Sequence, residues 1–169
     1  MITLVLGGNK SGKSAFALEL LEKAPGPRLI VPTGKAMDLN FRQQILDHKQ
    51  DRGPGVPVLE TGDDLPEALR RIKEAYGSIV VDSLDFWLFS CLRDSSGHER
   101  IDELLQILDD WKQTELILVS CEIGLGPLSA DRETRYFVRR MGGLNQAVAR
   151  VATQVYLVSA GLPLALKKA

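Results

Sequence analysis

The sequence predicts an α/β fold in which a mostly parallel sheet is covered by helices on both faces. Short apolar segments of strand length alternate along the chain with longer segments of helical periodicity, the pattern expected of parallel sheets. Hydrophobic residues make up 44% of the chain and aromatic residues only 6%, which favours strands packed under helices over an aromatic-rich sandwich. With 169 residues, the chain has the length of one domain, so we expect residues 1–169 to fold as a single unit.

The first half of the chain alternates between strand and helix patterns. An apolar run begins almost at the first residue, and beyond a glycine-rich segment apolar residues recur at helical spacing until Pro25 and Gly26. Phe41, Ile45 and His48 lie at i, i+4 and i+7, which predicts a helix before the breaker-rich RGPGVP. The expected elements are strands at 2–6 and 28–31 and helices at about 13–24, 41–48 and 65–72.

The second half ends in a predicted hairpin. The segment LDFWLFSCL at 84–92 is apolar enough for either a strand or a helix, but its polar spacing and Asp85 favour a helix. The polar DSSGHE at 94–99 predicts a surface loop, and QVYLVS and LALK, separated by the turn AGLP, predict two antiparallel strands. The expected elements are strands at 78–82, 115–120, 154–159 and 164–167 and helices at 84–92, 101–111 and 131–153.

The stretch GGNKSGKS at 7–14 lies between a predicted strand and a predicted helix. Gly7, Gly12, Lys13 and Ser14 fit the pattern Gly-x-x-x-x-Gly-Lys-Ser, in which glycines adopt backbone conformations closed to other residues and amides face phosphate oxygens. Lys13 would reach the β and γ phosphates of a nucleoside triphosphate, and the Ser14 hydroxyl would bind Mg²⁺. The sequence therefore predicts a P-loop NTPase-like fold. The predicted phosphate-binding residues are Gly7, Gly8, Asn9, Lys10, Ser11, Gly12, Lys13 and Ser14.

An acidic residue, Asp82, ends the apolar strand SIVVD. A carboxylate at this position in P-loop proteins holds the Mg²⁺ shell, so Asp82 is a second candidate metal ligand beside Ser14. Without a phosphate loop in the same chain, an acidic residue at a strand end is equally often the cap of the next helix.

Composition argues against several kinds of partner. With 21 basic and 22 acidic residues the net charge is −1, so no overall field attracts nucleic acid or an anionic membrane. No apolar stretch reaches the length of a membrane span. The two cysteines, Cys91 and Cys121, are too few for a disulfide framework and favour a reducing compartment, so we expect a cytoplasmic protein.

His48 has two possible interpretations, a residue packed on the core or a nucleophile. It continues the apolar stripe of the predicted helix at 41–48, so the ring can simply pack on the core. Lys49 and Arg52, however, concentrate positive charge beside it, and a neutral imidazole can attack phosphorus. The other histidine, His98, lies in the predicted polar loop and is expected to be solvated.

Several motifs occur in a fixed order along nearly the whole chain. Together they resemble the adenosylcobinamide kinase / adenosylcobinamide-phosphate guanylyltransferase family, the bifunctional enzymes of cobalamin biosynthesis. The motifs are GGNKSGKS at 7–14, Thr33, ILDHKQDR at 45–52, VVDSLDFWL at 80–88, VSCEIGLG at 119–126, the spacing F-x-x-x-x-G-x-LNQ from Phe137 to Gln146, and VYLVSAGLPLALK at 155–167.

The resemblance implies two reactions, with ATP or GTP and Mg²⁺ in the first and GTP in the second. A triphosphate phosphorylates the aminopropanol hydroxyl of adenosylcobinamide, and GTP then transfers GMP to that phosphate through a guanylylated histidine. The matching residue is His48, with Lys49 and Arg52 stabilising phosphate charge. Thr33 and Glu60 match nucleotide-binding positions of the family, and Gly34, Lys35, Gln50 and Asp51 are their neighbours in the same loops.

The chain departs from the family pattern at a few positions. Gln44 replaces an arginine, Cys121 an asparagine and Ser129 a proline. An enzyme that retains only one of the two activities, or a P-loop protein that binds nucleotide without chemistry, therefore stays an alternative. The family forms ring-like assemblies, so the resemblance also implies a homo-oligomer.

Overall fold

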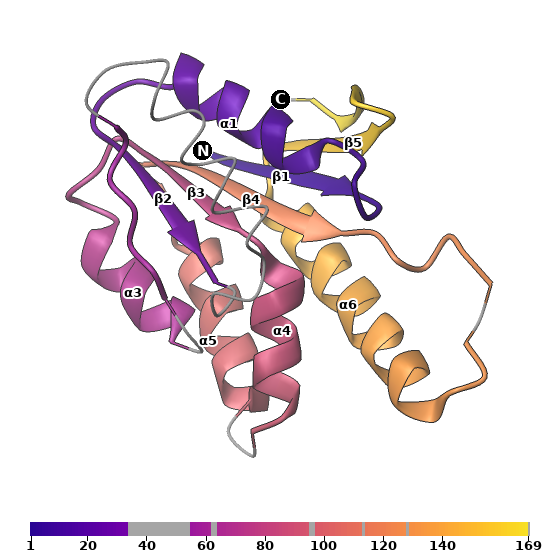
Figure 1. The fold of residues 1–169 in the computed structure, drawn as a ribbon. Helices are drawn as coiled ribbons and strands as arrows, with labels where there is room; N and C mark the ends of the chain where they lie inside the picture. The colour runs from indigo at the N-terminus through magenta and orange to yellow at the C-terminus, as the bar shows by residue number, and fades with distance from the viewer. Residues whose placement is uncertain (34–54, 62–63, 95–96, 113, 128, 169) are drawn as a thin grey trace.

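The computed structural model describes residues 1–33, 55–61, 64–94, 97–112, 114–127 and 129–168. Strands and helices alternate along these residues, as the sequence predicts (Figure 1). The strands are β1 (Ile2–Gly7), β2 (Arg28–Pro32), β3 (Ser78–Asp82), β4 (Glu115–Cys121), β5 (Gln154–Ser159) and β6 (Leu162–Lys167). The helices are α1 (Lys13–Lys23), α3 (Leu65–Ile72), α4 (Leu84–Leu92), α5 (Gly97–Asp109) and α6 (Arg132–Val151).

The strands form one sheet in the order β2-β3-β4-β1-β5-β6. All neighbours are parallel except β5 and β6, which pair antiparallel, so the predicted mostly parallel sheet and its C-terminal hairpin are confirmed. The first strand of the chain thus lies at the centre, between β4 and β5. Gly7 pairs with Cys121 of β4 and with Val158 of β5, which places the end of β1 between these two neighbours.

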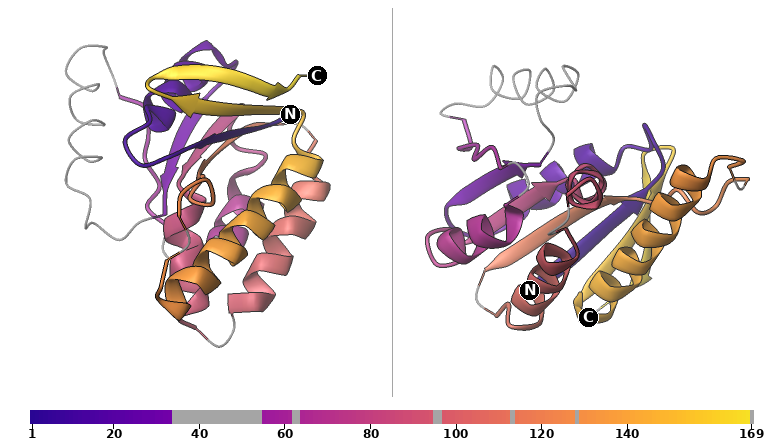
Figure 2. Two further views of the ribbon diagram at one scale, coloured as in Figure 1. Left: turned by 90° about the vertical axis from the view of Figure 1, so that its right-hand side faces the viewer. Right: turned by 90° about the horizontal axis from the view of Figure 1, so that it is seen from below.

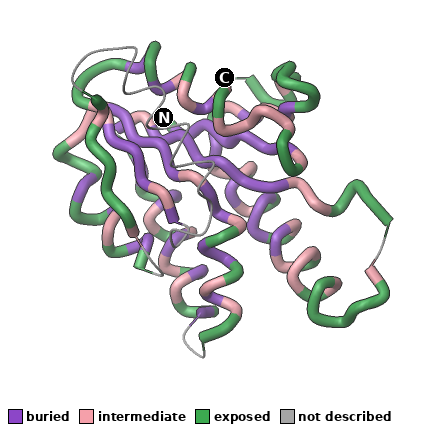
Figure 3. Tube along the Cα trace, in the orientation of Figure 1, coloured by how far each residue is buried: buried purple, intermediate pink, exposed green. Residues whose placement is uncertain are grey.

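Helices cover both faces of the sheet, but unequally. Figure 2 shows α1 on one side and α3, α4, α5 and α6 on the other. Alternate strand residues point to the two faces: Val5 and Val80 pack with α1, whereas Leu4 and Val81 pack under the four other helices. The central strands are buried along their length (Figure 3), which explains why their sequences are continuous runs of apolar residues.

The segment 55–61 lies along the free edge of β2. Val58 forms an isolated parallel bridge with Ile30, and the amide of Thr61 donates to the carbonyl of Pro32 at 3.2 Å. The edge of the sheet is thereby partly covered, and Glu60 is carried to the carboxyl end of β2.

Two local predictions are wrong. The segment DSSGHE was expected to be a loop throughout, but α5 begins at Gly97, so His98 lies in its first turn and its Nδ1 is 2.9 Å from a guanidinium nitrogen of Arg140. The turn AGLP is shorter than expected: only Ala160 and Gly161, with φ of 51° and 78°, connect the strands. A two-residue turn with positive φ at both positions matches the twist of a hairpin, so Pro163 falls in β6.

Within the described ranges, no helix combines the length and the apolar composition needed to cross a membrane.

Candidate nucleotide-binding site

The predicted phosphate loop connects β1 to α1. Gly12 is the N-cap of α1 and has φ of 95°, a conformation that favours glycine, as predicted. Gly7 was also expected to adopt a backbone conformation closed to other residues, but it does not have positive φ, so a glycine is required there for another reason. A Cβ on Gly7 would lie 2.7 Å from the carbonyl oxygen of Val158 and would also clash with Ser11 Oγ, so this glycine is needed for close packing. The second residue with positive φ in the loop is Lys10, at 57°.

The start of α1 is suited to bind an anion. No side chain caps the helix, so its first N–H groups have no side-chain acceptor and the positive end of the helix dipole faces the loop. Lys13 folds back, and its Nζ donates to the carbonyl of Gly8 at 3.2 Å. A carbonyl is a weak partner for an ammonium group compared with a phosphate, so phosphate oxygens can displace it.

The hairpin turn between β5 and β6 packs directly on the phosphate loop. The amide of Gly161 donates to the carbonyl of Ser11 at 2.8 Å. A Cβ on Gly12 would lie 3.0 Å from the Cα of Gly161, so the two backbones touch. Sequence reasoning missed this contact, because nothing in the motif GGNKSGKS or in the turn itself indicates which strand lies next to β1.

The end of β4 is held by a buried side chain of α6. Asn145 is 5% exposed; its Nδ2 donates to the carbonyl of Cys121 at 3.0 Å, and its Oδ1 accepts from Ser120 Oγ at 2.6 Å. The amide of Glu122, the residue after Cys121, donates to the carbonyl of Gly7 at 3.0 Å. Asn145 therefore fixes the strand end that lies beside the phosphate loop.

A threonine ties β2 to the turn that follows β3. The Thr33 hydroxyl donates to the carbonyl of Ser83 at 2.5 Å and accepts from the Ser83 amide at 3.1 Å, and the Thr33 amide donates to the carbonyl of Asp82 at 3.1 Å. Thr33 is 2% exposed, so its hydroxyl is committed to the backbone. A predicted nucleotide-binding residue thus has a clear role in positioning the β3 end that carries Asp82.

The oxygen atoms that could act as metal ligands at this edge fit a Mg²⁺ ion that arrives with a nucleotide. Ser14 lies in the first turn of α1, Asp82 ends β3, and α1 packs against β3. Hydroxyl and carboxylate oxygens are the ligands that Mg²⁺ prefers, and one or two of them suffice when phosphates complete the shell. No group of three or more His, Cys, Asp or Glu side chains in the described part of the chain forms a ready-made metal site.

Cys121 lies among charged groups at the same edge. Its burial raises the pKa of the thiol, Lys13 opposes this rise through its positive charge, and Asp85 and Glu122 add to it through their negative charges. These three side chains are therefore electrostatic neighbours of Cys121. The thiol is neutral at pH 7, since its ordinary pKa already lies above that value.

Part of the predicted site lies outside the described residues. This holds for the predicted helix at 41–48 and for Gln44, and for the candidate site residues Gly34, Lys35, His48, Lys49, Gln50, Asp51 and Arg52. The structure brings the others together: the residues from Gly7 to Ser14, Thr33, Glu60 and Asp82 all lie at the carboxyl ends of β1, β2 and β3.

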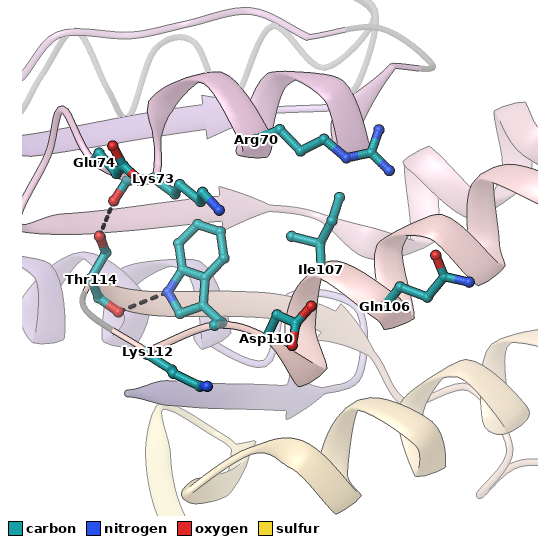
Figure 4. A pocket seen from close by; sticks show the side chains of 9 residues that line it. Arg70, Lys73, Glu74, Gln106, Ile107, Asp110, Lys112 and Thr114 are labelled. Atoms are coloured by element: carbon teal, nitrogen blue, oxygen red, sulfur yellow. Dashed lines mark hydrogen bonds between the residues drawn. The ribbon is translucent and has the colours of Figure 1, made fainter.

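A cleft of about 410 Å³ lies at the other end of the sheet, between α3, α5 and the start of β4. Figure 4 shows how Thr114 closes its wall: the hydroxyl donates to the carbonyl of Lys73, and the Thr114 carbonyl accepts from Trp111 Nε1 at 2.8 Å. Arg70 at its rim is paired with Glu103 at 3.3 Å. This cleft is separate from the phosphate loop.

A parallel sheet with a glycine-rich loop between its central first strand and an uncapped helix defines a P-loop nucleotide-binding protein of the NTPase type. Residues 3–166 match the model of the family "Cobinamide kinase / cobinamide phosphate guanyltransferase", which is nearly the whole chain. The chain belongs to this family.

Two curated relatives agree with this family. The "Bifunctional adenosylcobalamin biosynthesis protein CobP" of Pseudomonas aeruginosa is 33% identical over 171 residues, covering 99% of this chain and 98% of the relative. The "Bifunctional adenosylcobalamin biosynthesis protein CobU" of Salmonella typhimurium is 28% identical over 182 residues, covering 99% of this chain and all of the relative.

Solved structures share the fold at low identity. A KaiC-like protein from Pyrococcus horikoshii matches with a TM-score of 0.55 and 17% identity, over 92% of this chain and 69% of the other. An ATPase of a bacterial type III secretion system matches with a TM-score of 0.61 and 9% identity, over 97% of this chain but only 56% of the other. At these identities the likeness concerns the fold alone.

Proposed function

We propose that this protein phosphorylates adenosylcobinamide and then transfers GMP from GTP to adenosylcobinamide phosphate, in cobalamin biosynthesis. The observation that carries the proposal is an intact phosphate loop at the carboxyl edge of the sheet, in a chain that matches the family over residues 3–166. Both reactions break a phosphoanhydride bond of a nucleoside triphosphate, which is the ligand that such a loop binds.

In the kinase step, ATP or GTP places its phosphates on the loop from Gly7 to Ser14. Lys13 exchanges the Gly8 carbonyl for the β and γ phosphates, and the helix dipole of α1 adds positive potential. Ser14 and Asp82 would hold Mg²⁺, which neutralises charge on these phosphates when bound. The acceptor hydroxyl then attacks the γ phosphorus and the nucleoside diphosphate leaves.

In the transfer step, a nitrogen of His48 attacks the α phosphorus of GTP and pyrophosphate leaves. An oxygen of adenosylcobinamide phosphate then attacks the same phosphorus, and the bond to histidine breaks. Lys49 and Arg52 would stabilise the phosphate charge. Glu60, which lies beside the carboxyl end of β2, would contact the nucleotide.

The test is covalent labelling with GTP that carries ³²P in its α phosphate, in the presence of Mg²⁺. We expect an acid-labile, base-stable adduct on the wild-type protein and none on His48→Ala. His98→Ala is a matched control, because His98 is the other histidine of the chain and lies exposed on α5. Label that persists in His48→Ala, or that disappears in His98→Ala, contradicts the assignment.

The corrinoid acceptor needs an apolar surface, and exposed aromatic side chains on α4 and α6 offer one. Phe86 and Phe89 on α4 are 50% and 52% exposed. Phe89 packs edge to face on Phe137 of α6, with ring centroids 5.9 Å apart, and Tyr136 beside it is 47% exposed. We expect Phe86→Ala to raise the KM for the corrinoid about tenfold, the loss of one aromatic contact, without changing nucleotide affinity.

The predicted homo-oligomer is part of the proposal. The edge strand β6 leaves Leu162, Leu164 and Leu166 exposed, with relative exposures of 73%, 60% and 56%. A row of exposed leucines on a terminal strand favours pairing with a second copy of the chain. Sedimentation equilibrium tests this: Leu164→Glu is expected to shift the wild-type assembly to a smaller species, and a wild-type monomer contradicts it.

We also propose that the protein works in the cytoplasm. Both cysteines, Cys91 and Cys121, are free and buried, which suits a reducing compartment, and cell fractionation tests the assignment.

The structure also describes two of the three departures from the family pattern. Cys121 contributes its carbonyl to Asn145, and Ser129 Oγ accepts from the amide of Asp131 at 3.1 Å, so both support local structure. An enzyme with only one activity would show one of the two steps when adenosylcobinamide and its phosphate are assayed separately.

A further inference from the structure

Asp85 is a carboxylate in the first turn of α4, three residues after Asp82 at the end of β3. From the sequence alone, Asp85 only supported the prediction of a helix at 84–92. Its place is rigid, because Leu84, Trp87 and Leu88 of the same helix are fully buried and the preceding Ser83 is held at both its backbone groups by Thr33. The Asp85 carboxylate is therefore fixed at the edge of the sheet where the phosphate loop lies.

One oxygen of this carboxylate is buried without a partner. Asp85 Oδ1 is shielded from solvent and accepts no hydrogen bond from any residue that the structure describes. A buried carboxylate oxygen without a donor is costly, so such an atom points to a missing partner. The partner must be a hydrogen-bond donor or a cation, because a carboxylate oxygen offers only lone pairs.

The unpartnered oxygen belongs to the surroundings of the phosphate loop. Asp85 and Lys13 both act electrostatically on the thiol of Cys121, whose residue pairs with Gly7. Lys13 is the residue expected to hold the γ phosphate. Asp85 and Lys13 therefore both lie within electrostatic range of the same thiol at the carboxyl ends of the strands.

We propose that Asp85 is the general base of the kinase step; this inference rests on the proposed function. The donor is the acceptor hydroxyl of the corrinoid. As its oxygen forms a bond to the γ phosphorus, the bond from that phosphorus to the β-γ bridging oxygen breaks. The nucleoside diphosphate leaves with the electron pair, the hydroxyl proton passes to Asp85, and it is later released to water.

Other groups at this edge are less suited to the role. Asp82 is the expected Mg²⁺ ligand, and Glu122 Oε1 already accepts from the amide of Gly124 at 2.7 Å. The Cys121 thiol is neutral because burial raises its pKa. Among the described residues at this edge, Asp85 is the carboxylate with a buried oxygen still available.

The two reactions of one protein provide the test. The hydroxyl acceptor of the kinase step must lose a proton, whereas the phosphate acceptor of the transfer step has none to lose at pH 8. Asp85→Asn keeps the shape of the side chain but cannot accept the proton. We expect its kcat for phosphorylation to fall roughly 10²- to 10⁴-fold, the usual range for a lost general base. Nucleotide Kd, corrinoid KM, guanylylation of the protein and GMP transfer should stay within about threefold.

Controls separate catalysis from folding. Asp102→Asn removes the same charge from an exposed position of α5 and should leave both reactions unchanged. A role of Asp85 in structure alone would lower both reactions and the Tm together, and that result overturns the inference. Asp85→Asn with wild-type kcat in the kinase step also overturns it, while the proposed function stands. A wild-type protein without kinase activity overturns both.

Discussion

The amide of Asn145 is expected to contribute substantially to the free energy of unfolding. Asn145→Ala removes the acceptor of the Ser120 hydroxyl and one donor to the Cys121 carbonyl, all in buried surroundings. Each buried polar group left without a partner costs about 1–3 kcal/mol, so we expect the two groups to give a loss of about 2–6 kcal/mol. For a protein of this size, 3 kcal/mol corresponds to a fall in Tm of roughly 6–12 °C.

Urea unfolding of a double-mutant cycle measures this contribution. Ser120→Ala removes the other partner, so the double variant should be more stable than the sum of the single effects predicts, by about 1 kcal/mol or more. Gln146→Ala changes the neighbouring exposed side chain of the same helix and should stay within about 0.5 kcal/mol of the wild type. A loss below about 1 kcal/mol for Asn145→Ala, or strict additivity, would refute the reasoning.

Three further predictions concern the loop, the hairpin and α6. Gly12→Ala forces a side chain into a φ of 95° and against Gly161 at 3.0 Å, so nucleotide Kd measured by titration should rise at least tenfold; an unchanged Kd contradicts this. Ala160→Asn suits the positive φ of 51° and should stabilise the protein by about 0.5–1 kcal/mol in urea unfolding; a loss of stability argues against the turn geometry. Asp131 caps α6, and hydrogen bonds from Thr134 lower its pKa below the ordinary 3.8. Its stabilisation is present above pH 3.8 and lost as pH falls through the lower folded-state pKa, so the stability advantage over Asp131→Ala should vanish at acid pH in thermal unfolding.

Much of the fold could be predicted because its signals are local. Apolar runs such as SIVVD and ELILVS are strands buried on both faces, and glycine or proline marks many of their ends. The phosphate loop is a contiguous motif whose flanking strand and helix could be checked within the first 24 residues. The start of α5 was missed, because the buried Gly97 and the polar residues around it look like a turn.

The contacts that shape the site could not be predicted, because they depend on the order of strands in the sheet. Gly161 meets Ser11 because β5 lies beside β1, and Asn145 reaches Cys121 because α6 crosses the end of β4. Neither partner stands out in the sequence. Asp85 had a visible signal, an acid inside an apolar helix, but its buried oxygen became apparent only in three dimensions.

The central place of β1 also bears on how the protein is made. β1 is synthesised before its partners: it pairs with β4 and β5, which begin at residues 115 and 154, and the loop that follows β1 rests on a turn at residue 161. A nascent chain therefore lacks β4 until residue 121 has been synthesised, and β5 until residue 159 has been synthesised. We expect the nucleotide site to form only after the turn at residue 161 has been synthesised, and until then the strand ITLVLG is open to aggregation.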